Sequence, residues 1–271
     1  MNIIKSIKKY YQLCIIVLAV YASPLHANPH PTLILIHGAL FTSSVWSPIQ
    51  NYLQSAGYQV VTVDTPGRLQ DGIAPNDATL SAAVDKVCQV VALQSKPVIL
   101  VGHNQAGAII TQATASCGSY IRGLIYLAAV VPWPGERPFD MLSDQDNKNF
   151  DLAAPLETKT GLSIPDTQAP IHQLFMSDAD PAQAQQAIQT MVPEPIMFAY
   201  DILDYNLEAF HHIPKFYIKT LNDVMISPES QERFIQREPM NRVIELPTGH
   251  CPFISKPILM GKMLAEIADG L

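Results

Sequence analysis

The segment 97–110, PVILVGHNQAGAII, constrains the fold of this chain more than any other stretch. It opens with four consecutive apolar residues at 98–101 and leads into a run of mostly small residues at 106–115. A continuous apolar run indicates a strand that is buried on both faces of a parallel sheet. The segment therefore predicts a strand, a sharp turn and a closely packed helix, with Asn104 at the turn.

The same alternation of strands and helices repeats along the chain. Apolar runs predict strands at 32–36, 59–63, 98–101, 124–127, 216–219 and 243–246. Apolar residues at helical spacing predict helices at 46–56, 80–91, 106–115 and 258–268. This alternation implies an α/β fold with a mostly parallel, doubly wound sheet. At 271 residues, of which 48% are hydrophobic, the chain is long enough for one such domain.

The alternation breaks down between about residues 133 and 212. This region is rich in proline and carries only short helical patterns. We expect it to form a small cap insertion over the carboxyl edge of the sheet, where α/β proteins bind their ligands.

The first 27 residues have the layout of a secretory signal peptide. Lysines at positions 5, 8 and 9 precede an apolar stretch at 13–22, and Ala27 is a small residue at a suitable cleavage point. The apolar stretch is too short to span a bilayer, and an uncleaved membrane anchor is the alternative. We therefore predict cleavage near Ala27, a domain of residues 28–271, and export to the periplasm or secretion.

Charge and cysteine content limit the partners and the compartment. Removal of three lysines with the leader would change the formal net charge from −7 to −10. An acidic surface repels phosphate backbones and anionic membranes, so neither is expected as a partner. In an oxidising compartment Cys88 and Cys117 are the expected disulfide pair if their helices are neighbours, which would leave Cys251 free. Three buried thiols are the alternative.

The turn at Asn104 has the spacing of a nucleophile elbow. Gly102, Ala106 and Gly107 supply the small side chains that such a strained strand-to-helix turn requires, although an ordinary turn is the alternative. Asp223 and His250 each follow a predicted strand, in the chain order nucleophile, acid, histidine. Each alone would be read as a surface or capping residue.

Acyl transfer also needs two backbone N–H groups that stabilise the developing oxyanion. One comes from the residue after the nucleophile and the other from a loop after an early strand. These criteria select Gln105 and Ala39, although the segment around Ala39 could instead be only a tight turn.

The order of HGAL at 37–40, VGHNQAG at 101–107, YIKTLND at 217–223 and PTGH at 247–250 resembles the α/β-hydrolase superfamily. The likeness is strongest to the branch that holds plant methylesterases and hydroxynitrile lyases, and it extends over essentially the whole domain. By this resemblance Asp223 and His250 act as acid and base, and Ala39 and Gln105 as oxyanion donors. It also implies that Leu40, Trp133 and Phe139 shape a pocket for a small acyl or aromatic ligand.

This chain departs from the family at the nucleophile, where Asn104 stands in place of serine. A carboxamide has no proton that histidine can usefully remove, so the ordinary acyl-enzyme cannot form. The lyase activity is disfavoured further, because Cys251 follows His250 where lyases of this branch carry lysine.

Four explanations of Asn104 stay open. The scaffold has lost turnover and binds a small apolar ligand, or His250 and Asp223 activate water directly while Asn104 orients the substrate. Alternatively, Asn104 deamidates to aspartate, which Gln105 would make slow because the following backbone nitrogen attacks fastest before glycine. The last explanation is an introduced substitution.

We therefore predict an esterase-like hydrolase for a small apolar carboxylic ester, with reduced or altered catalysis; a catalytically silent ligand-binding protein is the alternative. The sequence contains neither a phosphate loop nor a dinucleotide fingerprint, so no cofactor is expected. No metal is expected either, because His211 and His212 have no further ligands at metal spacing. His37 and His103 are expected to make structural hydrogen bonds.

Overall fold

The computed structural model describes residues 30–68 and 71–271, so the predicted signal peptide lies outside the described residues. Its main strands are β1 (Leu33–Ile36), β2 (Val60–Val63), β3 (Val98–His103), β4 (Ile121–Leu127), β8 (Lys215–Thr220) and β9 (Arg242–Leu246). They form one sheet in the order β2-β1-β3-β4-β8-β9, and all the pairings are parallel. The predicted α/β fold with a mostly parallel sheet is confirmed.

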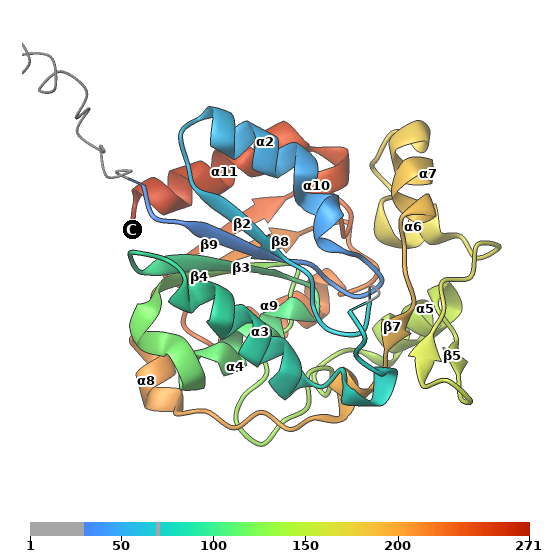
Figure 1. Cartoon of the computed structure of the whole chain (residues 1–271). Coiled ribbons are helices and arrows are strands. Elements are labelled where there is room, and N and C mark those ends of the chain that lie inside the picture. The colour runs from blue at the N-terminus through green and yellow to red at the C-terminus, as the bar shows by residue number, and fades with distance from the viewer. Residues whose placement is uncertain (1–29, 69–70) are drawn as a thin grey trace, which may run out of the picture.

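Helices cover both faces of this sheet (Figure 1). One layer contains α2 (Ser47–Ser55), α10 (Pro252–Ser255) and α11 (Pro257–Asp269), and the other contains α3 (Leu80–Ala92), α4 (Ala106–Cys117) and α9 (Pro228–Arg237). Successive side chains of a strand point to opposite faces. Leu33 and Leu35 of β1 accordingly pack into one apolar cluster, and Ile34 and Ile36 pack into the other. The continuous apolar run thus reflects burial on both faces.

A disulfide joins Cys88 of α3 to Cys117 of α4, with the two Cα atoms 5.8 Å apart. The expected pairing is therefore confirmed, because these two helices are neighbours. Cys251 is a free thiol that is fully buried, and burial raises its pKa well above the usual value.

Most of the predicted insertion lies beyond the edge of the main sheet (Figure 1). It contains the helices α5 (Asp144–Ala153), α6 (Ile171–Phe175) and α7 (Pro181–Gln189), and an antiparallel sheet of β5 (Leu156–Glu157), β6 (Leu162–Ser163) and β7 (Glu194–Pro195). Short 3₁₀ helices of the described residues include η4 (Met197–Tyr200) in the insertion, and η1 (Ser43–Trp46), η2 (Pro75–Asp77) and η3 (Gly118–Tyr120) elsewhere in the domain. We call residues 144–200 the cap.

The last helix of the insertion, α8 (Leu207–His211), belongs to the body of the domain. Its Phe210 is fully buried in the apolar cluster that also contains residues of α3 and α4. In the described part of the chain, no helix combines the length and the apolar character that crossing a bilayer requires.

Candidate active site

Asn104 occupies the sharp turn between β3 and α4 with a left-handed backbone, φ 56°. Asparagine is one of the few residues besides glycine that enter this region readily. Two glycines make room for the turn. A Cβ at Gly38 would lie 2.7 Å from Cβ of Asn104, and one at Gly107 would collide with the carbonyl oxygen of Val130. The turn therefore has the tight backbone packing of the predicted elbow.

The structure brings the predicted acid and histidine to Asn104. Asp223 follows β8 and His250 follows β9, and these two strands are adjacent in the sheet. His250 Nδ1 lies 2.7 Å from Asp223 Oδ2, and His250 Nε2 lies 2.9 Å from Asn104 Nδ2. All three residues are buried. They form a continuous chain of hydrogen bonds from the acid to the elbow.

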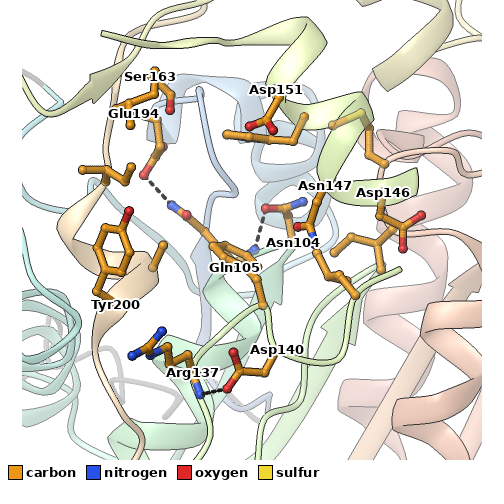
Figure 2. Close-up of a pocket in the computed structure, with 18 of the residues that line it drawn as sticks. Asn104, Gln105, Arg137, Asp140, Asp146, Asn147, Asp151, Ser163, Glu194 and Tyr200 are labelled. Carbon is orange, nitrogen blue, oxygen red and sulfur yellow. Dashed lines mark hydrogen bonds between the residues drawn. The ribbon is translucent and has the colours of Figure 1, made fainter. Parts of the chain in front are cut away.

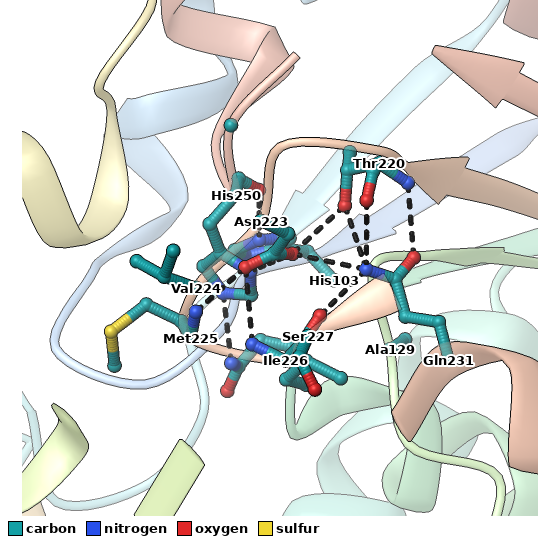
Figure 3. Close-up of polar contacts among 12 residues, drawn as sticks. His103, Ala129, Thr220, Asp223, Val224, Met225, Ile226, Ser227, Gln231 and His250 are labelled. Atoms are coloured by element: carbon teal, nitrogen blue, oxygen red, sulfur yellow. Dashed lines mark hydrogen bonds and ion pairs between the residues drawn. The ribbon is translucent and has the colours of Figure 1, made fainter. Parts of the chain in front are cut away.

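The carboxylate of Asp223 accepts five hydrogen bonds (Figure 3). Its donors are His250 Nδ1, Thr220 Oγ1 at 2.8 Å, Gln231 Nε2 at 3.3 Å, and the backbone N–H groups of Met225 at 2.8 Å and Ile226 at 3.1 Å. Apart from His250, which follows β9, these donors come from β8, from the loop after it and from α9. They hold the carboxylate in place against the ring of His250.

The same hydrogen bonds fix the orientation of the Asn104 amide. Since His250 Nδ1 donates to the Asp223 carboxylate, Nε2 is left as the acceptor of the ring. The NH₂ group of Asn104 therefore donates to Nε2, and its carbonyl oxygen Oδ1 accepts from the Gln105 N–H at 2.7 Å (Figure 2). Asn104 thus lies at the predicted nucleophile position, and its side chain also occupies one of the two predicted oxyanion donors.

Two further histidines near the site make the structural hydrogen bonds that we expected. His37 Nδ1 donates to the Gly38 carbonyl oxygen at 2.9 Å, and its Nε2 accepts from the Thr65 N–H at 3.1 Å. Burial, followed by the charge of Arg68, lowers the pKa of His37 to about 3. His103 Nε2 donates to the carbonyl oxygen of His250 at 3.1 Å, and burial lowers its pKa well below the usual value.

Glu194 of β7 holds both segments that carry predicted oxyanion donors. Its Oε1 accepts from Gln105 Nε2 at 2.9 Å and pairs with the guanidinium of Arg68, while Oε2 accepts from the Leu40 N–H at 2.9 Å. Leu40 directly follows Ala39, and its backbone is also left-handed, φ 67°.

The Glu194–Arg68 pair is removed from water, since the two side chains are 5% and 4% exposed. Burial lowers the pKa of Arg68 to about 9, although Asp64 and Asp71 act in the opposite direction. Sequence reasoning missed this pair, because no local pattern links two residues that lie 126 positions apart.

A cavity of about 450 Å³ ends at Asn104 and Gln105 (Figure 2). Its apolar wall includes Phe139, Leu142, Phe150, Ile196, Met225 and Ile226. Four carboxylates also line it, from Asp140, Asp146, Asp151 and Glu194, together with the guanidinium of Arg137. The cavity therefore combines an apolar wall with an acidic lining.

The predicted pocket residues have different surroundings. Phe139 lines the cavity, whereas Leu40 is fully buried and is not part of the lining. Trp133 lies outside the cavity: the Arg237 guanidinium sits 4.7 Å from its ring centroid, and its Nε1 donates to Glu238 at 3.3 Å. Within residues 30–68 and 71–271, no group of three or more His, Cys, Asp or Glu side chains could hold a metal ion.

The chain is related to known hydrolases along most of its length. It matches the alpha/beta hydrolase family over residues 33–259. It is 30% identical over 257 residues to a pyrethroid hydrolase of Sphingobium wenxiniae, with 88% of each chain covered. It is 27% identical over 258 residues to methylesterase 17 of Arabidopsis thaliana, with 88% of this chain and 91% of that one covered.

A solved structure of a pyrethroid hydrolase from Sphingobium faniae has a TM-score of 0.79 to this chain at 25% identity. The match covers 88% of this chain and 97% of that one. The fold, the arrangement at the elbow and these relationships lead to one assignment: the chain belongs to the alpha/beta hydrolase family, in its methylesterase branch.

Proposed function

We propose that this protein is an esterase-type hydrolase of small apolar carboxylic esters whose turnover is reduced because Asn104 replaces the nucleophilic serine. The observation that carries the proposal is the 2.9 Å contact between Asn104 Nδ2 and His250 Nε2, at the end of a largely apolar cavity. The relationship to a methylesterase supports an ester as the substrate class.

The remaining groups support slow hydrolysis by water. His250 is oriented by Asp223 and can remove a proton from a water molecule, while the N–H groups of Gln105 and Ala39 stabilise the oxyanion. Hydrolases that lack a member of the triad keep a rate of roughly 10³ to 10⁴ over water. Asn104 must then move, because its Oδ1 occupies the Gln105 N–H.

A catalytically silent ligand-binding protein is the second candidate. The two hydrogen bonds of the Asn104 carboxamide favour it, because they occupy His250 Nε2 and the Gln105 N–H, the two groups that hydrolysis would use. Such a protein would use the cavity without using the base.

The disulfide bears on the compartment. We infer that the domain functions in an oxidising compartment, the periplasm or the exterior of the cell, after cleavage of the predicted signal peptide. The Cys88–Cys117 bond supports this, since such bonds persist mainly outside reducing cytoplasm.

Hydrolysis of short-chain aryl esters by the natural protein, Asn104→Ser and Asn104→Ser/His250→Ala tests the proposed function. We expect Asn104→Ser to raise kcat/KM by about 10³-fold or more, and the second change to abolish the gain. A natural protein as fast as Asn104→Ser would contradict reduced turnover. If no variant hydrolyses any ester of the panel, the esterase assignment fails.

Thermal unfolding with the same esters separates the two candidates. A silent binder gives no ester hydrolysis above the His250→Ala background, and its melting temperature still rises with ligand in the His250→Ala variant. A slow esterase shows a steady rate that His250→Ala removes.

A further inference from the structure

The side chain of Asn104 lies in the site as a bound amide substrate would. Its carbonyl oxygen accepts from the Gln105 N–H at 2.7 Å, and its nitrogen lies 2.9 Å from His250 Nε2. When an amide is hydrolysed, negative charge develops on the carbonyl oxygen and the leaving nitrogen takes up a proton. The two groups that assist these changes already contact the two ends of this carboxamide.

We propose that the site hydrolyses the side-chain amide of its own Asn104, which becomes aspartate with release of ammonia. A water molecule adds to Cγ and gives a proton to His250 Nε2, while the Gln105 N–H stabilises the charge on Oδ1. The C–N bond then breaks as His250 returns that proton to Nδ2. Carboxamide plus water becomes carboxylate plus ammonium, without oxidation or reduction.

The surroundings supply what this step needs. Asp223, held by its five donors, balances the imidazolium that forms during proton transfer. Asn104 is 7% exposed and borders the cavity of about 450 Å³, so water reaches its side chain from the ligand side.

This route differs from spontaneous deamidation. In the spontaneous reaction the following backbone nitrogen attacks Cγ, and the cyclic imide that results opens to both aspartate and isoaspartate. Here the backbone N–H of Gln105 donates a hydrogen bond to Oδ1 of Asn104, so this nitrogen is not directed at Cγ of Asn104. Attack by water gives aspartate alone, and this difference in product identifies the route.

Incubation of the full chain in ¹⁸O-labelled water, followed by digestion and peptide mass spectrometry, tests the proposal. We expect aspartate at position 104 with one heavy oxygen, free of isoaspartate, and formed at least about 100-fold faster than at other asparagines. The exposed residues Asn51 and Asn222 are internal references in the same digest. Conversion at 104 that is no faster than at these two, or that yields isoaspartate, would overturn the proposal.

Variants and unfolding provide the controls. His250→Gln should slow conversion by about 100-fold or more, the contribution of a positioned general base. His212→Gln, at an exposed histidine, should leave the rate unchanged. If His250→Gln does not fold, the natural protein in urea replaces it: equal rates in folded and unfolded chains would contradict a reaction of the site. If the natural protein is purified with aspartate already at 104, His250→Gln purified in parallel decides: asparagine retained in the variant supports the proposal, and aspartate in both proteins contradicts it.

The inference goes beyond the proposed function, and its outcome is independent of ester turnover because residue 104 itself is measured. Ester assays of the natural protein should accordingly record the mass of the peptide that carries this residue. If no variant hydrolyses an ester but Asn104 is converted to aspartate, only the proposed function is refuted. If esters are hydrolysed but Asn104 is not converted, only this inference is refuted.

Discussion

Asn104 combines a left-handed backbone with two hydrogen bonds from one carboxamide. Asparagine tolerates this backbone region better than most residues, and strain at such positions is commonly retained for function. We therefore expect the Asn104→Ser variant to gain activity without gaining stability. Serine at position 104 would be more reactive than asparagine but less suited to the left-handed backbone. Activity and stability should therefore change in opposite directions, as they commonly do at functional sites.

His37 makes the fold sensitive to acid. Its pKa is lowered from 6.5 to about 3 by burial, so between these values the unfolded chain binds a proton that the folded chain does not. The free energy of unfolding should therefore decrease as the pH falls from 6.5, by up to about 1.4 kcal/mol per pH unit, and this effect is absent above 6.5.

Urea unfolding of the natural protein and of His37→Gln at about pH 7, 6 and 5 measures this slope. The variant should lose less stability on acidification, whereas His212→Gln should behave as the natural protein does. Part of the slope should persist in His37→Gln, because burial also lowers the pKa of His103. Identical slopes in the natural protein and His37→Gln would show that His37 is not responsible.

Among the elements, the buried strands were the most predictable and α9 was missed. Strands such as β1 are apolar at every position because both faces are covered. Helix α9 has only two large apolar residues, Phe234 and Ile235, of which Phe234 is fully buried, so no apolar residues recur at helical spacing to mark it. Ser227 and Pro228 did carry a helix start signal. The omission mattered, because α9 supplies Gln231 to the acid and Arg237 to Trp133.

The site was predictable where chain order and strand ends determine it. Asn104, Asp223 and His250 follow strands of one parallel sheet, so their convergence follows from topology. Glu194 and Arg68 were not predictable, because their roles depend on how the cap rests on the domain. The same applies to Trp133, whose position depends on a helix that the sequence pattern did not reveal.

Strand β7 contributes a testable ion pair. Glu194→Ala would leave the buried guanidinium of Arg68 without its partner, which should cost about 3–5 kcal/mol of unfolding free energy. Arg68→Met/Glu194→Leu should recover most of that stability, because apolar replacements of a buried pair are often tolerated. Urea unfolding of both variants measures the difference, and a double variant as unstable as the single one would contradict the assignment.

At the scale of the whole molecule, carboxylates of the cap contact the segments that carry the predicted site residues. Glu194 holds the two segments that carry the predicted oxyanion donors. Asp146 accepts from the hydroxyl groups of Ser227 and Ser230, at the start of α9 beside the acid loop. Asp178 accepts from the Gly249 N–H at 3.0 Å, next to His250. The cap therefore acts as one unit that positions the loops at the sheet edge.

The charge of the cavity should discriminate between an ester and its acid product. Among the described residues, its lining contains four carboxylates and one guanidinium, that of Arg137, and Arg68 lies behind Glu194. A neutral ester should therefore raise the melting temperature more than the corresponding carboxylate does near pH 7, and added salt should narrow the difference by screening.

Asp140→Asn/Asp151→Asn should improve binding of the carboxylate, because both side chains line the cavity. Asp144→Asn is the matched control, since this exposed aspartate in the first turn of α5 is not part of the lining. Equal stabilisation by ester and acid in the natural protein would show that the carboxylates do not govern selectivity.

Because Asn104 Oδ1 accepts from the Gln105 N–H, the side chain of Asn104 competes with a ligand carbonyl for this donor. A tethered carbonyl is present at a high effective concentration, so a ligand carbonyl must displace it to reach the same donor. The free energy that a ligand gains from a hydrogen bond to the Gln105 N–H is largely cancelled by loss of the hydrogen bond between this N–H and Asn104 Oδ1. Ligands are consequently selected by the hydrocarbon part that contacts the cavity wall, and the ester group contributes little to affinity until Asn104 is replaced or converted.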